Sequence, residues 1–364
     1  MQFCIYTCMI VISWLGAKAI IASGNDPALG LTTGNLTALI TYTMQILSSL
    51  MMLSMVFAML TISLSSARRI AEALEERSDI PQPEQPVMTV RDGAVDFDHV
   101  SFKYSAHAKR QALDDIDLHI TSGETIGIIG GTGSAKSTLV NLIARLYDTT
   151  EGAVRVGGVD VRDYDLDALR HQVAMVLQKN VLFSGTIAEN LRWGDPNATD
   201  EEVREAAHLA CADEFVDGFP KGYDTWIEQG GSNVSGGQKQ RLCIARALLR
   251  RPKILILDDS TSAVDTKTDA KIRAGLASYL PNTTKIIIAQ RISSVQDADR
   301  IIVMEGGRIA QIGNHEELLK TSEIYRETFT SQNKMSAEGE GAVEADTEAS
   351  ATQAQTQEGG EAHE

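Results

Sequence analysis

A glycine-rich turn between an apolar strand and a helix is the feature that most constrains how this chain of 364 residues folds. The strand is expected over Thr125–Ile129 and the helix from Lys136 onward, because apolar residues recur there at helical spacing. In α/β domains such a turn surrounds phosphate oxygens with backbone N–H groups and with the helix N-terminus. The candidate nucleotide-binding residues form one run: Gly130, Gly131, Thr132, Gly133, Ser134, Ala135, Lys136, Ser137 and Thr138.

Two positions of this run would carry specific chemistry. Lys136 would reach the β- and γ-phosphates, and Ser137 would coordinate Mg²⁺. The strict pattern has glycine before the lysine, whereas this chain has Ala135. Alanine is tolerated there if its φ is negative, as expected of a nearly helical residue. The imperfect match alone is also compatible with an ordinary glycine-rich turn, but Asp258 at a strand end downstream favours a nucleotide site.

Two stretches near the N-terminus are long and apolar enough to cross a membrane. Residues 3–22 contain only Lys18 as a charge, and residues 36–64 contain none. The first lacks the basic start and the cleavage site of a secretory signal, and the alternative for either stretch is a buried core helix. Arg68 and Arg69 follow the second stretch and predict a cytoplasmic end. We therefore expect an integral protein in contact with the lipid of the plasma membrane, with both chain ends in the cytoplasm.

Changes of composition divide the chain into four segments. Residues 1–76 are expected to be a partial transmembrane domain with a cytoplasmic helical extension, and the prolines of residues 77–93 indicate a linker. Residues 94–330 have the short apolar runs of an α/β domain, with helix formers over 187–250. Residues 331–364 are predicted to be a disordered acidic tail, because they offer almost nothing to bury. The net charge of −16 argues against a nucleic-acid partner.

A short motif in the helix-rich region predicts an anion site. Val234 precedes Ser235-Gly236-Gly237-Gln238, and the Ser-x-x-Gln spacing predicts a capping box at the start of a helix. The two glycines leave the first N–H groups of that helix accessible, and a helix N-terminus attracts anions. Alone, these four residues would more often be a helix cap only. Their distance ahead of the strand that ends at Asp258 makes the motif specific.

Together these motifs resemble the nucleotide-binding domain of an ATP-binding cassette (ABC) transporter, and the resemblance covers roughly residues 1–330. It implies an α/β P-loop NTPase cassette with a helical subdomain and an antiparallel β subdomain, preceded by two transmembrane α-helices. It implies ATP and Mg²⁺ as cofactors, with Tyr104 stacked on adenine, although Tyr104 is also compatible with an aromatic residue that simply ends a strand. The implied Mg²⁺ ligands are Ser137, Gln178 and Asp258.

The resemblance also implies a dimer. In the family the helix that begins at Ser235 meets the γ-phosphate of a nucleotide held by the opposing domain. Asp265 is implied to lie in the segment that links the two sites across the dimer. Gln178 is implied to sense the membrane domain as well as to contact Mg²⁺. The transported substrate is left open, and a small molecule, a lipid and a peptide all remain candidates.

Two chemical positions depart from the family pattern. Asp259 replaces the glutamate that polarises the attacking water, and Gln290 replaces a histidine. The missing methylene retracts the carboxylate by about 1–1.5 Å, and misplacement on that scale can lower a rate about a hundredfold. Gln290 can donate to a γ-phosphate but cannot carry the positive charge of an imidazolium. Asp259, Gln290 and Gln178 are therefore the candidate catalytic residues of a slow site.

These features resemble the degenerate-site subunit of a bacterial heterodimeric exporter of the multidrug or lipid type, with a second ABC half-transporter as its partner. The two apolar stretches resemble the last two of six helices, so the chain is expected to be N-terminally truncated. Two alternatives stay open. One is a truncated or regulatory membrane-anchored ATP-binding protein without transport, and the other is a non-transport ABC ATPase that acts on ribosomes or DNA.

Overall fold

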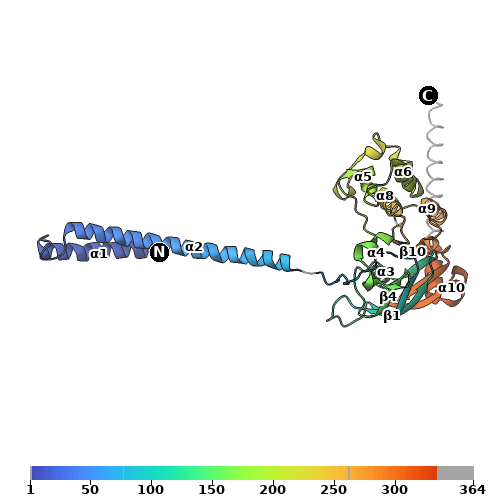
Figure 1. The fold of residues 1–364 in the computed structure, drawn as a ribbon, viewed down its shortest axis with the longest axis horizontal. Coiled ribbons are helices and arrows are strands. Elements are labelled where there is room, and N and C mark those ends of the chain that lie inside the picture. The colour runs from blue at the N-terminus through green and yellow to red at the C-terminus, as the bar shows by residue number, and fades with distance from the viewer. Residues whose placement is uncertain (1, 77, 261–262, 334–364) are drawn as a thin grey trace, which may run out of the picture. The chain divides into compact units, whose positions relative to one another are not determined.

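The computed structural model describes residues 2–76, 78–260 and 263–333. Within them the chain forms two compact units that divide between Asp79 and Ile80 (Figure 1). We call the first the helical hairpin and the second the α/β domain. All but the first three residues of the predicted acidic tail lie outside the described residues.

The helical hairpin consists of α1 (Gln2–Ser23) and α2 (Thr33–Glu75), which run side by side (Figure 1). The connection is held by Asn25, whose side-chain oxygen accepts from the Thr33 amide at 2.9 Å. Thr32 then caps α2 by accepting from the amide of Asn35. Gly16 of α1 lies against Leu36 of α2, since a Cβ on Gly16 would collide with the side chain of Leu36.

Both helices of the hairpin are long and apolar enough to cross a membrane. At 1.5 Å per residue, α1 is about 33 Å long and α2 about 65 Å, against a hydrocarbon layer of about 30 Å. None of the residues of α2 is buried within the structure. Its large apolar side chains, including Phe57 and Ile62, are exposed and require an apolar environment that the hairpin itself does not provide.

The α/β domain is built on a six-stranded sheet with the strand order β12-β11-β3-β10-β9-β6. All pairings are parallel except that of β11 with β12. These strands are β3 (Thr125–Gly130), β6 (Val173–Val176), β9 (Ile254–Asp258), β10 (Thr284–Ile288), β11 (Arg300–Glu305) and β12 (Arg308–Gly313). Every residue of β9 and β10 is buried, as their continuous apolar runs predict.

A second, antiparallel sheet has the order β2-β1-β4-β5. It consists of β1 (Val95–Phe102), β2 (Leu113–Ile120), β4 (Glu151–Val156) and β5 (Val159–Asp160), and a separate short pair joins β7 (Gly185–Thr186) to β8 (Trp226–Ile227). The helices are α3 (Lys136–Ile143), α4 (Leu166–Gln172), α5 (Ile187–Arg192), α6 (Asp200–Leu209), α7 (Asp213–Val216), α8 (Gly236–Leu249), α9 (Thr266–Tyr279) and α10 (His315–Thr321). Short 3₁₀ turns lie at Val161–Asp163, Gly222–Asp224, Gln229–Gly231 and Ile292–Ser294.

The six-stranded sheet lies between two hydrophobic cores. Ile254 and Ile256 of β9 belong to the core shared with α3 and the antiparallel sheet. Leu255 and Leu257 alternate with them and belong to the core shared with α5, α6 and α8. These three helices lie together in a helical subdomain (Figure 1). The α/β fold with a helical and an antiparallel β subdomain is therefore confirmed.

The expectation of a negative φ at Ala135 is wrong. Ala135 has φ +71° and ψ 23°, which is left-handed, and it immediately precedes α3. The turn must bring the chain from the end of β3 into the start of α3 within five residues, and it does so by also placing Gly133 at φ +80°. A left-handed conformation costs an alanine about 1–2 kcal/mol.

We expect Ala135→Gly to stabilise the protein by about 1 kcal/mol, because glycine adopts positive φ without a steric cost. Ala274→Gly is the matched control, since Ala274 is exposed in the middle of α9 and the same change there should destabilise by about 1 kcal/mol. Denaturant unfolding of the three proteins measures both effects. Equal losses of stability in the two variants would contradict the strain at Ala135.

Candidate functional site

The carboxyl ends of four neighbouring parallel strands form one edge of the six-stranded sheet. Ile128 of β3 is in register with Ile288 of β10, and Ile288 is in register with Asp258 of β9. The turn after β3, the acidic pair at the end of β9 and the residue Gln290 after β10 therefore emerge side by side. Gln178 follows β6, the neighbour of β9. Open α/β sheets bind ligands at this edge.

The glycine-rich turn is tightly packed on one side and open on the other. A Cβ on Gly130 would collide with the carbonyl oxygen of Met304, so the turn lies directly on β11. Gly131 and Gly133, in contrast, have no neighbouring atom within 4 Å of where a Cβ would be. The turn can therefore surround an anion on its open side, while α3 presents its N-terminus from Lys136 onward.

Lys136 directs its ammonium group into the same turn. Its Nζ donates to the carbonyl oxygens of Gly130 at 2.8 Å and Gly131 at 3.0 Å, and to Oγ of Ser134 at 3.3 Å. Burial lowers the pKa of Lys136, and the charges of Asp258 and Asp259 oppose this shift. Phosphate oxygens at this position would replace neutral acceptors with charged ones and strengthen these hydrogen bonds.

Asp259 is the most constrained residue of the site. Its Oδ2 accepts from Nε2 of Gln290 at 2.7 Å and from Nε2 of Gln178 at 3.1 Å. It has φ +49°, and its side chain is largely buried. Burial raises the pKa of Asp259, and the charge of neighbouring Asp258 raises it further, while the two amide donors and Lys136 limit the shift. Strained, desolvated groups of this kind are concentrated at functional sites.

The donor set fits a magnesium ion. Ser137 offers a hydroxyl group on the exposed side of α3, and Asp258 offers a carboxylate at the end of β9. The amide nitrogen of Gln178 is used by Asp259, which leaves its carbonyl oxygen for a cation. Hard oxygen ligands combined with nucleotide phosphates are what Mg²⁺ prefers. Across the described parts of the chain, no cluster of three or more His, Cys, Asp and Glu side chains offers a competing metal site.

Tyr104 lies just beyond β1 and next to α3. Its hydroxyl group is 2.9 Å from Oγ1 of Thr138, and the residue is 55% exposed. Its edge contacts are with Phe102, at a centroid distance of 4.8 Å, and with Tyr147, at 5.1 Å. Sequence reasoning did not identify Tyr147, because this second exposed ring follows α3 in a segment that contains no recognisable motif.

The Ser-Gly-Gly-Gln motif starts α8, as predicted. Ser235 accepts from the amide of Gln238 at 3.3 Å, and the Gln238 side chain accepts from the amide of Ser235 at 2.9 Å, which completes the capping box. A Cβ on Gly237 would lie 2.8 Å from the carbonyl oxygen of Ala263, and Asp265 caps the next helix, α9. Among the described residues, no hydrogen bond joins Val234–Gln238 to the glycine-rich turn.

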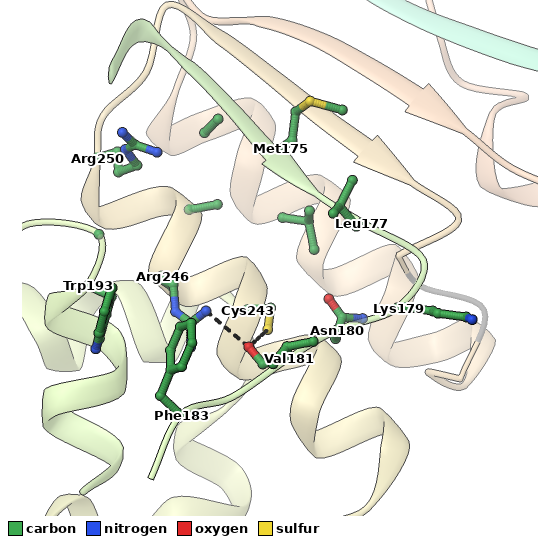
Figure 2. A pocket seen from close by; sticks show the side chains of 14 residues that line it. Met175, Leu177, Lys179, Asn180, Val181, Phe183, Trp193, Cys243, Arg246 and Arg250 are labelled. Atoms are coloured by element: carbon green, nitrogen blue, oxygen red, sulfur yellow. Dashed lines mark hydrogen bonds between the residues drawn. The ribbon is translucent and has the colours of Figure 1, made fainter. Parts of the chain in front are cut away.

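A groove of about 260 Å³ lies beside Gln178, between the segment after β6 and α8 (Figure 2). Phe183 and Trp193 stack there with a centroid distance of 4.5 Å, and both are exposed. Arg246 on α8 fixes the groove by donating to the carbonyl of Val181 at 3.2 Å and to the carbonyl of Asn190 at 2.9 Å. The groove is thus an open surface that combines exposed aromatic rings with basic side chains.

Comparisons with known proteins agree with this architecture. Residues 113–262 match the family model described as ABC transporter. The α/β domain has the P-loop fold of an ABC transporter ATP-binding domain, and two apolar helices precede it.

The chain is similar to several ABC transporter ATP-binding proteins and to a solved exporter structure. An uncharacterized ABC transporter ATP-binding protein of Bacillus subtilis, YfiB, is 40% identical over 89% of this chain and 55% of its own length. The putative multidrug export ATP-binding/permease protein YgaD of the same organism is also 40% identical, with the same coverage. A solved structure of a bacterial Atm1-family ABC exporter with ATP bound has a TM-score of 0.75 at 32% identity, over 91% of this chain and 58% of that one. The chain spans about half the length of these curated relatives.

We expect Asp259→Asn to stabilise the protein at pH 7 by about 0.5–2 kcal/mol, because it removes a buried charge and asparagine tolerates positive φ. A carboxyl group whose folded pKa is raised destabilises the fold above that pKa. The gain should therefore be complete at neutral pH and disappear as the pH falls through the raised folded pKa toward the unfolded pKa of about 3.9.

Thermal unfolding at pH 7 and at pH 4 measures this difference. Asp224→Asn is the control, since Asp224 is exposed and its neutralisation should change the stability by less than about 0.5 kcal/mol. A gain that grows at low pH would contradict the raised pKa of Asp259.

Proposed function

We propose that this chain is the ATP-binding subunit of an ABC-type membrane exporter, which couples ATP binding and hydrolysis to substrate efflux. The observation that carries the proposal is the convergence of the phosphate-binding turn, Asp258, Asp259, Gln178 and Gln290 at one edge of a parallel sheet. The helical hairpin supports a location in the plasma membrane, with the α/β domain in the cytoplasm.

Each residue has a distinct role in this proposal. The run from Gly130 to Thr138 binds the phosphates, Lys136 neutralises their charge, and Tyr104 stacks on adenine. Ser137, Gln178 and Asp258 would hold Mg²⁺, which would supply positive charge against the negative charge of the phosphates. Asp259 orients the attacking water, and Gln290 donates a hydrogen bond to the γ-phosphate.

We further propose that this site hydrolyses ATP slowly. Asp259 is one methylene shorter than glutamate, and Gln178 and Gln290 both donate to the same oxygen, Oδ2. The carboxylate is therefore retracted from the position of the attacking water, and one of its two oxygens is already occupied by two hydrogen bonds. Because Gln290 carries no charge, it adds little stabilisation to a phosphoryl group that gains charge.

The slow site favours a heterodimer with a second ABC half-transporter. The capping box at Ser235 leaves the N-terminus of α8 formed and accessible, so this chain offers a complete anion site to a partner's nucleotide. The partner would provide the glutamate that this chain lacks. Asp265 would lie between the two sites, because it caps α9 next to the segment that contacts Gly237.

The groove beside Gln178 supports a link to the membrane. Leu177, Val181, Phe183 and Trp193 expose apolar surface there, and we assign this surface to a cytoplasmic loop of a membrane domain. Gln178 is two residues beyond β6 and reaches Asp259, so a loop docked in the groove would act directly on the catalytic carboxylate. The exported substrate would be a small molecule, a lipid or a peptide.

A second candidate function is a membrane-anchored regulatory subunit that binds ATP without transport. The observation in its favour is the double hydrogen bond on Asp259, which suits ATP retention. The two functions predict different results in a transport experiment. An exporter subunit moves substrate when paired with a competent half-transporter, whereas a regulatory subunit shows nucleotide-dependent dimerisation without transport.

We expect Lys136→Ala to weaken the binding of Mg·ATP at least tenfold, because it removes the only lysine that donates into the described phosphate-binding turn. Titration of the purified full chain with a fluorescent ATP analogue measures the affinity. Lys320→Ala is the control, since Lys320 is exposed on α10 and its loss should leave the affinity unchanged. Unchanged affinity in Lys136→Ala would overturn nucleotide binding at this turn.

We expect the double variant Asp259→Glu/Gln290→His to raise the ATPase rate of the purified chain roughly a hundredfold, because it restores the reach of the carboxylate and a chargeable donor. Adding Lys136→Ala to the same background should abolish the gain, which excludes a contaminating ATPase. A wild-type chain that already turns over ATP at about 1–10 s⁻¹ would rule out the slow-site proposal.

A further inference from the structure

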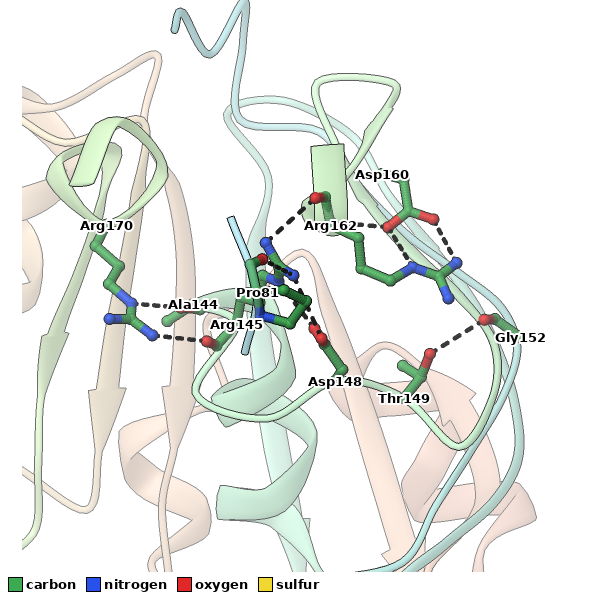
Figure 3. Close-up of polar contacts among 9 residues, drawn as sticks. All are labelled: Pro81, Ala144, Arg145, Asp148, Thr149, Gly152, Asp160, Arg162 and Arg170. Atoms are coloured by element: carbon green, nitrogen blue, oxygen red, sulfur yellow. Dashed lines mark hydrogen bonds and ion pairs between the residues drawn. The ribbon is translucent and has the colours of Figure 1, made fainter. Parts of the chain in front are cut away.

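Arg145 holds the linker against the end of the phosphate-binding helix (Figure 3). It lies two residues beyond α3 and is 1% exposed. Its guanidinium donates from Nη2 to the carbonyl of Pro81 at 3.0 Å, from Nη1 to the carbonyl of Arg162 at 3.2 Å, and from Nε to Asp148 at 2.8 Å. We call Arg145, Asp148 and the two carbonyls the linker clasp. A buried arginine with this many fixed partners has little freedom to move alone.

The backbone of Arg145 is fixed as firmly as its side chain. Arg170 donates from Nε to the carbonyl of Ala144 at 3.2 Å and from Nη2 to the carbonyl of Arg145 at 2.8 Å (Figure 3). These bonds satisfy carbonyl groups at the C-terminal end of α3, which a helix leaves without partners. Arg145 has φ +47°, a conformation that persists only when its surroundings impose it.

The linker is attached to the α/β domain beyond Pro81 as well. The amide of Val87 donates to the carbonyl of Asp163 at 2.8 Å, and the amide of Asp165 donates to the carbonyl of Val87 at 3.1 Å. Gln82 donates to Asp165 at 3.4 Å. Residues 81–87 therefore lie against the domain as a strap. Between the end of α2 at Glu75 and Pro81, only residues 76–80 remain in the sequence.

The two ends of α3 thus meet two different parts of the protein. Lys136 at its N-terminus enters the phosphate-binding turn, and Arg145 beyond its C-terminus holds the strap. The eight residues of α3 separate these ends by about 12 Å. Leu139, Leu142 and Ile143 of α3 are fully buried, so the helix moves as a rigid piece of the core.

We propose that Arg145 is a positioning residue that couples nucleotide occupancy of the phosphate-binding turn to docking of the strap, residues 81–87, through α3. The proposal rests on the proposed function only in requiring that nucleotide binds at the turn. Phosphate at the N-terminus of α3 fixes the position of this rigid helix and hence that of the clasp. A formed clasp in turn holds α3 in place before nucleotide binds, which lowers the entropic cost of binding. The strap is the covalent path from the α/β domain toward α2.

Coupling of this kind is reciprocal by thermodynamic necessity. The factor by which nucleotide favours the docked strap must equal the factor by which docking raises nucleotide affinity. We expect a factor of about five or more, the lower end of common coupling between sites. A purely structural role of Arg145 would change stability but would not make strap docking depend on nucleotide.

The strap contains one glutamate, Glu84, which is exposed, so cleavage by a glutamate-specific protease reports its release. With the full-length wild-type chain, we expect saturating Mg·MANT-ATP to slow cleavage after Glu84 about fivefold. The fragment that begins at Gln85, detected by mass spectrometry, identifies this cut among others. This comparison needs no variant, so it is decisive even if substitutions at Arg145 impair folding.

The variant arm uses Arg145→Lys and Arg145→Ala, with Arg162→Gln as the matched control. The side chain of Arg162 pairs with Asp160 nearby, while only its carbonyl belongs to the clasp. Both Arg145 variants should bind MANT-ATP about fivefold more weakly and lose the effect of nucleotide on Glu84 cleavage. Both effects should be smaller in Arg145→Lys than in Arg145→Ala. Arg162→Gln should behave like wild type in both measurements.

The outcomes separate the two proposals. If wild-type protein does not bind MANT-ATP, nucleotide binding at the turn fails and the coupling fails with it. If it binds MANT-ATP but Glu84 is cleaved at the same rate with and without nucleotide, the coupling alone is overturned. If the Arg145 variants retain both the affinity and the protection of wild type, Arg145 is not the positioning residue.

Discussion

The parallel pairing of β3 with β10 and of β10 with β9 is the constraint on which the site depends. It brings three chain segments that are far apart in sequence to one edge of the sheet, with Ile128, Ile288 and Asp258 in register. The cost of closing these long loops is met by burial, since β9 and β10 contact hydrophobic cores on both faces. A shift of one residue in either pairing would exchange the two faces of a strand and move Asp258 away from the turn.

Asp259, at this edge of the sheet, is held in an unfavourable environment by two hydrogen bonds. Its αL backbone, its burial and its raised pKa all oppose stability, and two amide hydrogen bonds to one oxygen compensate in part. The same bonds occupy Oδ2, which leaves only the other carboxylate oxygen for a water molecule. In the function that we propose, the site combines a phosphate-binding turn with a restrained catalytic group, a combination suited to holding ATP for a long time. At the opposite end of α3, Arg145 offers a way for that long occupancy to be communicated along the chain.

Much of the fold was predictable from the sequence, because its signals are local. The apolar runs of β3, β9 and β10, the capping box at Ser235 and the start of α3 at Lys136 each depend on a few neighbouring residues. Local spacing also placed the turn, the acidic pair and Gln290 at strand ends, and the resemblance to ABC transporters supplied their expected roles.

The features that the sequence did not predict depend on contacts between segments far apart in the chain, which local patterns do not encode. The positive φ of Ala135 follows from the path between β3 and α3, and it contradicts the expectation drawn from its neighbouring helix. The double hydrogen bond on Asp259 requires β6, β9 and β10 to be adjacent. Tyr147 reaches Tyr104 because the segment after α3 lies against Phe102 at the end of β1. The contact of Arg145 with Pro81 joins residues 64 positions apart that belong to no motif.

The central claim is that this site holds ATP more than it hydrolyses ATP, and single-turnover hydrolysis tests it most directly. The wild-type chain, in excess over γ-labelled Mg·ATP so that all nucleotide is bound, would be quenched in acid at intervals and the released phosphate counted. The account predicts that phosphate appears at about 0.1 s⁻¹ or slower, roughly a hundredfold below a typical enzyme turnover of about 10 s⁻¹. Complete conversion of the bound ATP within about a second would contradict it.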